Sequence, residues 1–363
     1  MTIQNTEKSK RRARRETFRL LALCAVLCVP LIGIAPVRDA AYRAVYRIVP
    51  PLQQKANVEL LQAAQSDDLT QVKLLVAHGA NVNFKDASGV TPLMSAISLV
   101  SRADETLSPI AKFLVQNGAN PNANAPTQQS LFFYVAENAT QDEREPSYAG
   151  YAELLQAMLD KGITPTQKYT LGDVLYHAVR FGTEKNVRDL LAQGADVNAE
   201  VRTRGSGPST ILLAAVHELR PEMVRLLLEH GANSNAVGSI YDTSAIEPPL
   251  LHLLAEMNYA APLSEKGSAI VRLLLEHGTD VNAFTSEVNP KTFEVIQNHF
   301  GKGWAALTYA AIANDLPTVQ LLVQHGANPN LRDKDGKTAL DYARRYKQTN
   351  VIRVLENATR TRK

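Results

Sequence analysis

Cysteine is nearly absent from this chain, and its placement excludes a disulfide framework. Two of the 363 residues are cysteines, Cys24 and Cys28, and both lie in one uncharged stretch near the N-terminus. The chain beyond them has no thiol, so it can fold in an oxidising compartment without mispairing. We interpret the two cysteines as small apolar residues of that stretch.

Sequence motifs of common enzymes are also missing. The chain has no phosphate-binding loop, no glycine fingerprint for a dinucleotide, no C-x-x-C pair and no H-E-x-x-H. Two His–acid pairs, Asp173 with His177 and His252 with Glu256, have the spacing of one helical face. Each pair needs a third group that the sequence does not place. We therefore expect no enzymatic activity, no cofactor and no metal ion.

One phrase recurs seven times and organises most of the chain. In the copy at 224–235, VRLLLEHGANSN, Val224, Leu227 and Leu228 have the spacing of an apolar helix stripe. Gly231 then suits a helix end, because glycine tolerates a left-handed backbone, and the asparagines after it favour a turn. The copies are 72–83, 111–122, 155–166, 187–198, 224–235, 271–282 and 319–330, with a degraded eighth at 350–360.

The spacing of the copies indicates a solenoid. Successive marker glycines are 39, 44, 32, 37, 47 and 48 residues apart, a period at which each unit buries its apolar face against its neighbours. A second, shorter helix is predicted before most copies, at 91–99, 130–138, 209–218, 248–256, 305–313 and 338–346. A histidine precedes four of the glycines, where it is expected to meet the last carbonyls of the helix: His78, His230, His277 and His325.

The order of elements resembles the ankyrin repeat. Each unit has a helix, a tight turn and a second helix, followed by Gly-Ala-Asn and a long loop. The closest segments are DASGVTPLMSAI at 86–97 and DKDGKTALDYA at 333–343, of which the first has methionine where the family has histidine. The resemblance implies an all-α solenoid of about eight helix-turn-helix repeats joined by β-hairpin-like loops. The expected repeats are about 56–83, 84–122, 123–166, 167–198, 199–235, 236–282, 283–330 and 331–360.

The region before the repeats predicts a single transmembrane anchor. Residues 20–37 carry no charge over 18 residues, and as a helix they would reach about 27 Å, enough to cross a hydrocarbon core. Lys and Arg number seven in 1–19 and four in 38–55, which favours a cytoplasmic N-terminus. A cleaved signal peptide is the alternative, although Pro36 would follow its cleavage site.

The expected layout is therefore a membrane-anchored, bacterial-type ankyrin protein. It comprises a basic cytoplasmic tail at 1–19, an anchor at 20–37, a juxtamembrane linker at 38–55 and a repeat domain at 56–360. Pro50 and Pro51 are expected to stop a preceding helix and to start a stiff spacer. The repeats would face the periplasmic side of a bacterial inner membrane.

Charge is distributed in three zones. Residues 1–55 carry a net +8, residues 56–336 a net −11 and residues 337–363 a net +6. Because the repeats are acidic, the basic pI does not indicate nucleic-acid binding. The expected partners are the bilayer, through residues 20–37, and a protein whose identity the sequence does not give.

The resemblance also implies where a protein would bind, because ankyrin arrays use hairpin tips and first helices. The variable tip positions predicted as protein-binding are Lys85, Ala87, Val90, Trp304, Lys334 and Lys337. For Trp304, the only tryptophan, two roles stay open: a contact anchor for a partner, or a plug that packs the preceding segment onto its own repeat. Insertions at 101–109, 140–150, 258–267 and 284–303 enlarge the loops and have no assigned role.

The predicted function is a membrane-tethered scaffold that mediates protein–protein interaction outside the cytoplasm. The alternative is a regulatory or stabilising subunit of a membrane complex, in which 1–19 or 20–37 makes the productive contact. An enzyme is a third class, with only the two His–acid pairs in its favour.

Topology gives the first test. Because positive charge is concentrated before residues 20–37, the C-terminal repeats should be translocated. A reporter that works only in the cytoplasm, fused after Lys363, should be inactive, and a reporter that works only outside should be active. Activity of the cytoplasmic reporter would contradict this orientation.

Overall fold

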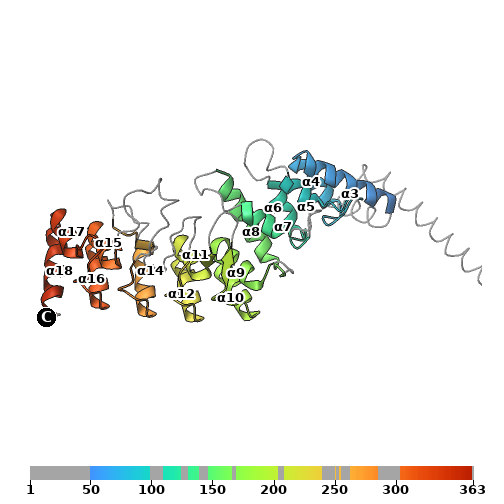
Figure 1. Cartoon of the computed structure of the whole chain (residues 1–363). Coiled ribbons are helices and arrows are strands. Elements are labelled where there is room, and N and C mark those ends of the chain that lie inside the picture. The colour runs from blue at the N-terminus through green and yellow to red at the C-terminus, as the bar shows by residue number, and fades with distance from the viewer. Residues whose placement is uncertain are drawn as a thin grey trace, which may run out of the picture. The chain divides into compact units, whose positions relative to one another are not determined.

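A computed structural model shows the chain as successive antiparallel helix pairs (Figure 1). It describes residues 50–98, 109–123, 130–138, 146–165, 169–202, 208–238, 250, 253–254, 262–284 and 303–361. The chain divides into two compact units, one ending at Ile163 and the other beginning at Thr164. The predicted anchor at 20–37 lies outside the described residues, within which no helix is long and apolar enough to cross a membrane.

The described part of the first unit forms three helix pairs, and its core is formed by the faces that the helices turn toward each other. The helices are α3 (Pro50–Gln65), α4 (Leu69–Ala77), α5 (Pro92–Ser98), α6 (Pro109–Gln116), α7 (Leu131–Asn138) and α8 (Pro146–Asp160). Leu60, Leu114 and Phe132 are fully buried between them. Pro50 begins α3 and so does not start a spacer. The expectation was wrong because proline, which lacks an N–H, fits the first turn of a helix.

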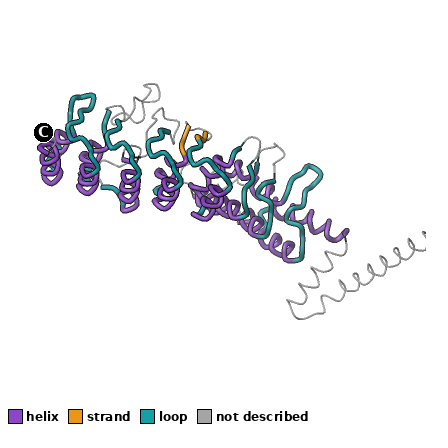
Figure 2. Tube along the Cα trace, turned by 90° about the horizontal axis from the view of Figure 1, so that it is seen from below, coloured by secondary structure: helices purple, strands orange, loops and turns teal. Residues whose placement is uncertain are grey.

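The second unit continues the same arrangement. Its elements are α9 (Leu171–Phe181), α10 (Glu184–Ala192), β1 (Glu200–Arg202), β2 (Pro208–Thr210), α11 (Ile211–His217), α12 (Pro221–Glu229), α14 (Glu265–Glu276), α15 (Ala306–Ile312), α16 (Leu316–Gln324), α17 (Ala339–Arg345) and α18 (Thr349–Thr361). Strands β1 and β2 form an antiparallel hairpin in which Glu200 pairs with Thr210. Figure 2 shows that the loops of this unit project from the same side of its helices.

The recurring phrase forms the structure that its residues predict. Val224 and Leu227 are fully buried and Leu228 is nearly so. Gly231 follows α12 with φ at +85°, and the other six marker glycines also have positive φ. The predicted shorter helices are confirmed as α5, α7, α11, α15 and α17, whereas most of 248–256 lies outside the described residues.

Two of the four histidines confirm the predicted contact with helix carbonyls. The Nδ1 atom of His230 lies 2.8 Å from the Leu226 carbonyl oxygen, and that of His277 lies 2.8 Å from the Leu273 carbonyl oxygen. These histidines therefore help to satisfy carbonyl groups at the ends of α12 and α14.

Asp173 caps the start of a helix. Its Oδ2 atom accepts hydrogen bonds from the Thr170 backbone N–H at 2.6 Å and from the Thr170 hydroxyl at 2.8 Å, which forms a capping box at the start of α9. The other pair, His252 with Glu256, lies outside the described residues.

Asparagine side chains connect consecutive repeats within each unit, and we call this set the asparagine ladder: Asn83, Asn122, Asn198, Asn235 and Asn282. The Asn235 amide donates to the Gly278 carbonyl at 3.1 Å and accepts from the Asp280 N–H at 2.7 Å. Asn83 and Asn198 make the same two bonds to their next repeats. The side chain that ends one phrase thus satisfies the backbone of the following one.

A buried ion pair gives α9 and α11 a second connection. Arg180 Nε lies 2.5 Å from Glu218 Oε1, and both side chains are 9% exposed. Next to this pair, the Arg220 guanidinium donates to the carbonyls of Val179, Arg180 and Gly182 at the end of α9. These charge-assisted bonds fix the ends of the two helices against each other.

The ladder predicts a measurable coupling between repeats. Asn235→Ala removes two hydrogen bonds and should lower the free energy of unfolding by about 1–2 kcal/mol, as measured by urea denaturation. Hydrogen exchange should increase first next to Gly278, because contacts in a solenoid are between neighbours. Asn330→Ala is the matched control, because no side-chain hydrogen bond of Asn330 is found among the described residues. If both variants lose the same free energy of unfolding, the asparagine ladder does not couple neighbouring repeats.

His177 predicts a pH dependence of stability. Burial, and then the charge of Arg180, lower the pKa of His177 from 6.5 to about 3. Below pH 6.5 the unfolded chain takes up a proton that the folded chain refuses until about pH 3, so stability falls as the pH falls through this range. The expected slope is on the order of 1 kcal/mol per pH unit. In the His177→Gln variant the urea midpoints at pH 7 and pH 5 should lie closer together than in the original chain. If stability changes with pH as steeply as before, His177 is not the cause of the pH dependence.

Candidate protein-interaction surface

The hairpin tips are shaped by aspartate carboxylates. Asp86 Oδ1 accepts from the N–H groups of Ser88 and Val90, each at 2.8 Å. In the last repeat Asp333 Oδ1 makes the equivalent bonds to Asp335 and Lys337, at 2.9 and 2.8 Å. A carboxylate that accepts from the backbone two and four residues later closes the turn. The two segments that most resemble the family motif therefore have the same tip geometry.

The structure places the predicted site residues in two groups. Lys85, Ala87 and Val90 belong to the first unit, where the first two are exposed and Val90 is half-buried. In the second unit Lys334 is exposed. Lys337 is half-buried, and its Nζ lies 6.0 Å from the Tyr342 ring centroid. Whether these side chains contact a partner remains a prediction.

Trp304 is not at the surface. Only 4% of it is exposed, and its Nε1 donates to Asp333 Oδ2 at 3.0 Å and lies 3.2 Å from the Tyr342 hydroxyl oxygen. Its ring packs edge-on against Tyr309 and Tyr342. Its inclusion among exposed contact residues was therefore wrong, and packing is its role. Two of its three packing partners, Asp333 and Tyr342, lie in the next repeat, whereas the sequence had suggested packing onto the repeat of Trp304 itself.

Asp333 is the electrostatic centre of this contact. Its Oδ2 atom accepts from Trp304 and, at 2.5 Å, from the Tyr342 hydroxyl, while Oδ1 holds the tip. Burial first, and then the hydrogen bond to Asp333, raise the pKa of Tyr342 to about 12. The phenol therefore keeps its proton and remains a donor to the carboxylate at physiological pH.

The second unit also has exposed hairpin residues that the sequence reasoning missed. We call them the stem row: Glu200, Val237, Phe284 and Arg332. Val237 is 55% exposed and Phe284 is 45% exposed, and they hold equivalent positions in neighbouring repeats. The Glu200 side chain is 60% exposed, and Arg332 is exposed as well. Four consecutive repeats thus carry one member each, in the order acidic, apolar, apolar and basic.

These four residues hold equivalent positions in the sequence, and two of them have the same backbone pairing. Each stands two positions after the last asparagine of its phrase. Glu200 pairs with Thr210, the N-cap residue of α11, and Phe284 pairs with Ala305, the N-cap residue of α15.

The residues that follow three members of the stem row agree with an outward-facing position for those members. Val201, Gly238 and Asp333, which follow three of its members, are buried, as expected where successive residues of an extended chain face opposite sides. The position could have been found in the sequence by counting from each phrase rather than from the tip motif.

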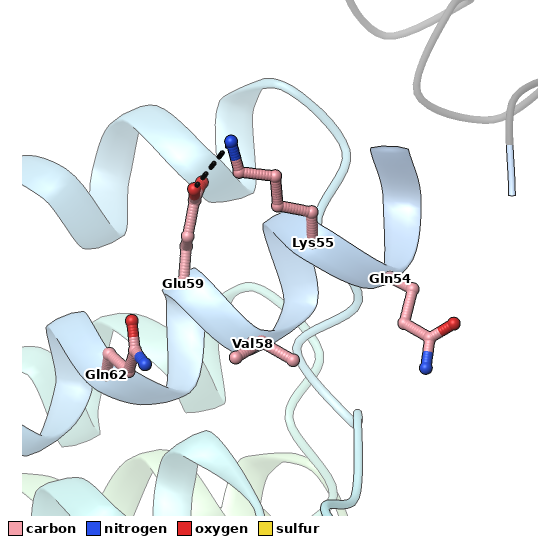
Figure 3. A pocket seen from close by; sticks show the side chains of 5 residues that line it. All are labelled: Gln54, Lys55, Val58, Glu59 and Gln62. Carbon is pink, nitrogen blue, oxygen red and sulfur yellow. Dashed lines mark ion pairs between the residues drawn. The ribbon is translucent and has the colours of Figure 1, made fainter. Parts of the chain in front are cut away.

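A shallow hollow on α3 offers little chemistry by comparison (Figure 3). Gln54, Lys55, Val58, Glu59 and Gln62 line it, and all five come from this one helix. Lys55 Nζ lies 3.7 Å from Glu59 Oε1, in an exposed pair. Ligand sites usually surround a molecule with groups from several elements, so this hollow is a weaker candidate than the hairpins. Within the described ranges no three His, Cys, Asp or Glu side chains are arranged to hold a metal ion.

Comparison with known proteins agrees with this geometry. The family model described as ankyrin repeats (3 copies) matches residues 40–141, 175–285 and 266–361. The chain belongs to the ankyrin repeat family. This ankyrin-repeat chain is thus mostly helical, and its family suggests protein partners and an interaction scaffold.

Curated relatives share the repeats over part of their length. The chain is 30% identical to human mitochondrial disaggregase over 189 residues, which are 50% of this chain and 26% of that protein. It is 26% identical to the ankyrin repeat domain-containing protein M-T5 of myxoma virus, over 75% of this chain and 50% of that protein. It is 27% identical to the mouse B-cell lymphoma 3 protein homolog, over 53% of this chain and 43% of that protein. The chain thus spans about a quarter to a half of these relatives.

The packing role of Trp304 gives a direct test. Trp304→Ala should lower the free energy of unfolding by about 3–5 kcal/mol, because it leaves a cavity, whereas Trp304→Phe should cost about 1–2 kcal/mol for the lost N–H donor. Both are measured by urea denaturation followed by circular dichroism. An unchanged free energy of unfolding in Trp304→Ala would contradict the buried position.

Proposed function

We propose that this chain is a membrane-tethered scaffold that binds a protein on the non-cytoplasmic side of a membrane, in the periplasm of a bacterium. The observation that carries the proposal is the stem row: four exposed side chains at equivalent positions on consecutive repeats, supported by the asparagine ladder. Because the ladder fixes backbone positions, the exposed side chains form a preformed surface that loses little entropy on binding.

The tether is supported by the sequence. Residues 20–37 are long enough and apolar enough to span a bilayer, and the preceding basic tail favours a cytoplasmic N-terminus. The repeats contain no cysteine, which suits an oxidising compartment. A short basic tail, an anchor and a binding domain would keep a partner at the membrane surface.

Site-directed crosslinking tests the scaffold function. A photoreactive phenylalanine analogue in place of Val237 or Phe284, in the full chain in its own membrane, should crosslink to the same protein. Placed instead of Arg225, an exposed residue of α12 outside the stem row, the analogue should not. Equal crosslinking from position 225, or no protein adduct from 237 and 284, would refute the stem row as the contact surface.

A regulatory or stabilising subunit of a membrane complex is the second candidate, and the dense positive charge of 1–19 favours it. Replacing residues 1–37 with an unrelated anchor of the same orientation separates the two functions. A scaffold should keep its adducts from positions 237 and 284. A regulatory subunit that acts through its tail or membrane segment should keep those adducts and lose the activity or stability of its complex.

A further inference from the structure

We infer that the stem row binds a partner helix with one face that is basic at one end, apolar in the middle and acidic at the other end. The inference rests on the proposed function and names the partner's chemistry. It follows from the order Glu200, Val237, Phe284 and Arg332 along consecutive repeats. It assigns one complementary side chain of the partner to each repeat.

The two central residues provide the apolar part of the contact. Val237 and Phe284 expose 55% and 45% of their surface, and water leaves that surface favourably when an apolar side chain covers it. The Asn235 amide, two residues before Val237, bonds directly to Gly278 and Asp280, which lie six and four residues before Phe284. The distance between the two hairpins is therefore fixed before a partner arrives.

The two ends supply opposite charges. The Glu200 carboxylate lies 3.6 Å from Arg202 in a pair whose side chains are 60% and 78% exposed, and exposed pairs of this kind contribute little. Glu200 therefore remains available to a cation of the partner. At the other end the Arg332 guanidinium donates to the Gly336 carbonyl at 2.6 Å. This bond orients the group and leaves further N–H donors for a carboxylate.

Repeat spacing favours a helix over an extended segment. Packed helices lie about 8–10 Å apart, and we expect neighbouring members of the stem row to have about this separation. Two turns of an α-helix rise about 11 Å over seven residues and return the side chain to almost the same face. In an extended strand the same distance takes about three residues, which puts the next side chain on the opposite face. A helix with anchors seven residues apart therefore matches all four positions.

The test uses three synthetic peptides and the full chain in nanodiscs. Each peptide is a 22-residue helix of alanine and glutamine with leucine at positions 8 and 15. The residues at positions 1 and 22 are Lys and Glu, Lys and Lys, or Glu and Glu. Fluorescence anisotropy should show that the Lys–Glu peptide binds best, by about two- to five-fold for each matched end. Val237→Asp should weaken all three peptides by about ten-fold or more.

Charge reversal makes the result specific. Glu200→Lys should shift the preference to the Glu–Glu peptide, and Arg332→Glu should shift it to the Lys–Lys peptide. Arg225→Glu changes the net charge as Arg332→Glu does but lies outside the stem row, so it should leave the order unchanged. The inference is wrong if the order stays the same in both charge-reversal variants, or if Arg225→Glu changes it equally. If a proline-interrupted peptide binds as well as the Lys–Glu helix, the partner is an extended segment and the inference of a helix is wrong.

The two proposals can fail separately. If no peptide binds while positions 237 and 284 still crosslink to a protein, the scaffold function stands and the partner chemistry is wrong. If the peptides bind as expected while those positions give no adduct in the membrane, the surface recognises such a helix, and the scaffold function at the membrane is refuted.

Discussion

Each repeat leaves polar backbone groups at its turn that the preceding repeat must satisfy, and the asparagine ladder meets this requirement. The amide of Asn235 reaches both a carbonyl and an N–H group of the following phrase, and Asn198 does the same one repeat earlier. Only a short side chain with a donor and an acceptor can make both bonds at once. The apolar stripes supply much of the free energy, but these bonds set the position of each hairpin relative to its neighbour.

The ladder leaves the residues beside it free to vary. Two positions after the ladder asparagine the side chain is exposed whether it is Glu200, Val237 or Phe284. In the proposed function, the scaffold bonds and the recognition side chains therefore occupy neighbouring positions of one hairpin. A chain built this way can change its partner through one residue per repeat without changing the bonds that hold the repeats together.

The last two repeats carry an additional connection. Asp333 organises the tip of the final hairpin with one carboxylate oxygen and holds Trp304 and Tyr342 with the other. A buried carboxylate is stable only when it is fully hydrogen-bonded, and here both oxygens are used. The tip motif that resembles the family's thus has a second role in this chain, because its aspartate also accepts a hydrogen bond from the tryptophan of the preceding repeat.

The sequence by itself determined the recurring helical stripes, several of the shorter helices and the glycine turns, because these depend on residues close together in the chain. The stripe of Val224 and Leu227 and the histidine bonds of His230 and His277 follow from such local patterns. Only the tertiary structure decided which variable positions face solvent. Trp304 looked like a tip contact, yet its partners Asp333 and Tyr342 lie 29 and 38 residues away. The exposure of Val237 and Phe284 likewise depends on hairpin pairing and on the packing of neighbouring repeats, which local spacing does not encode.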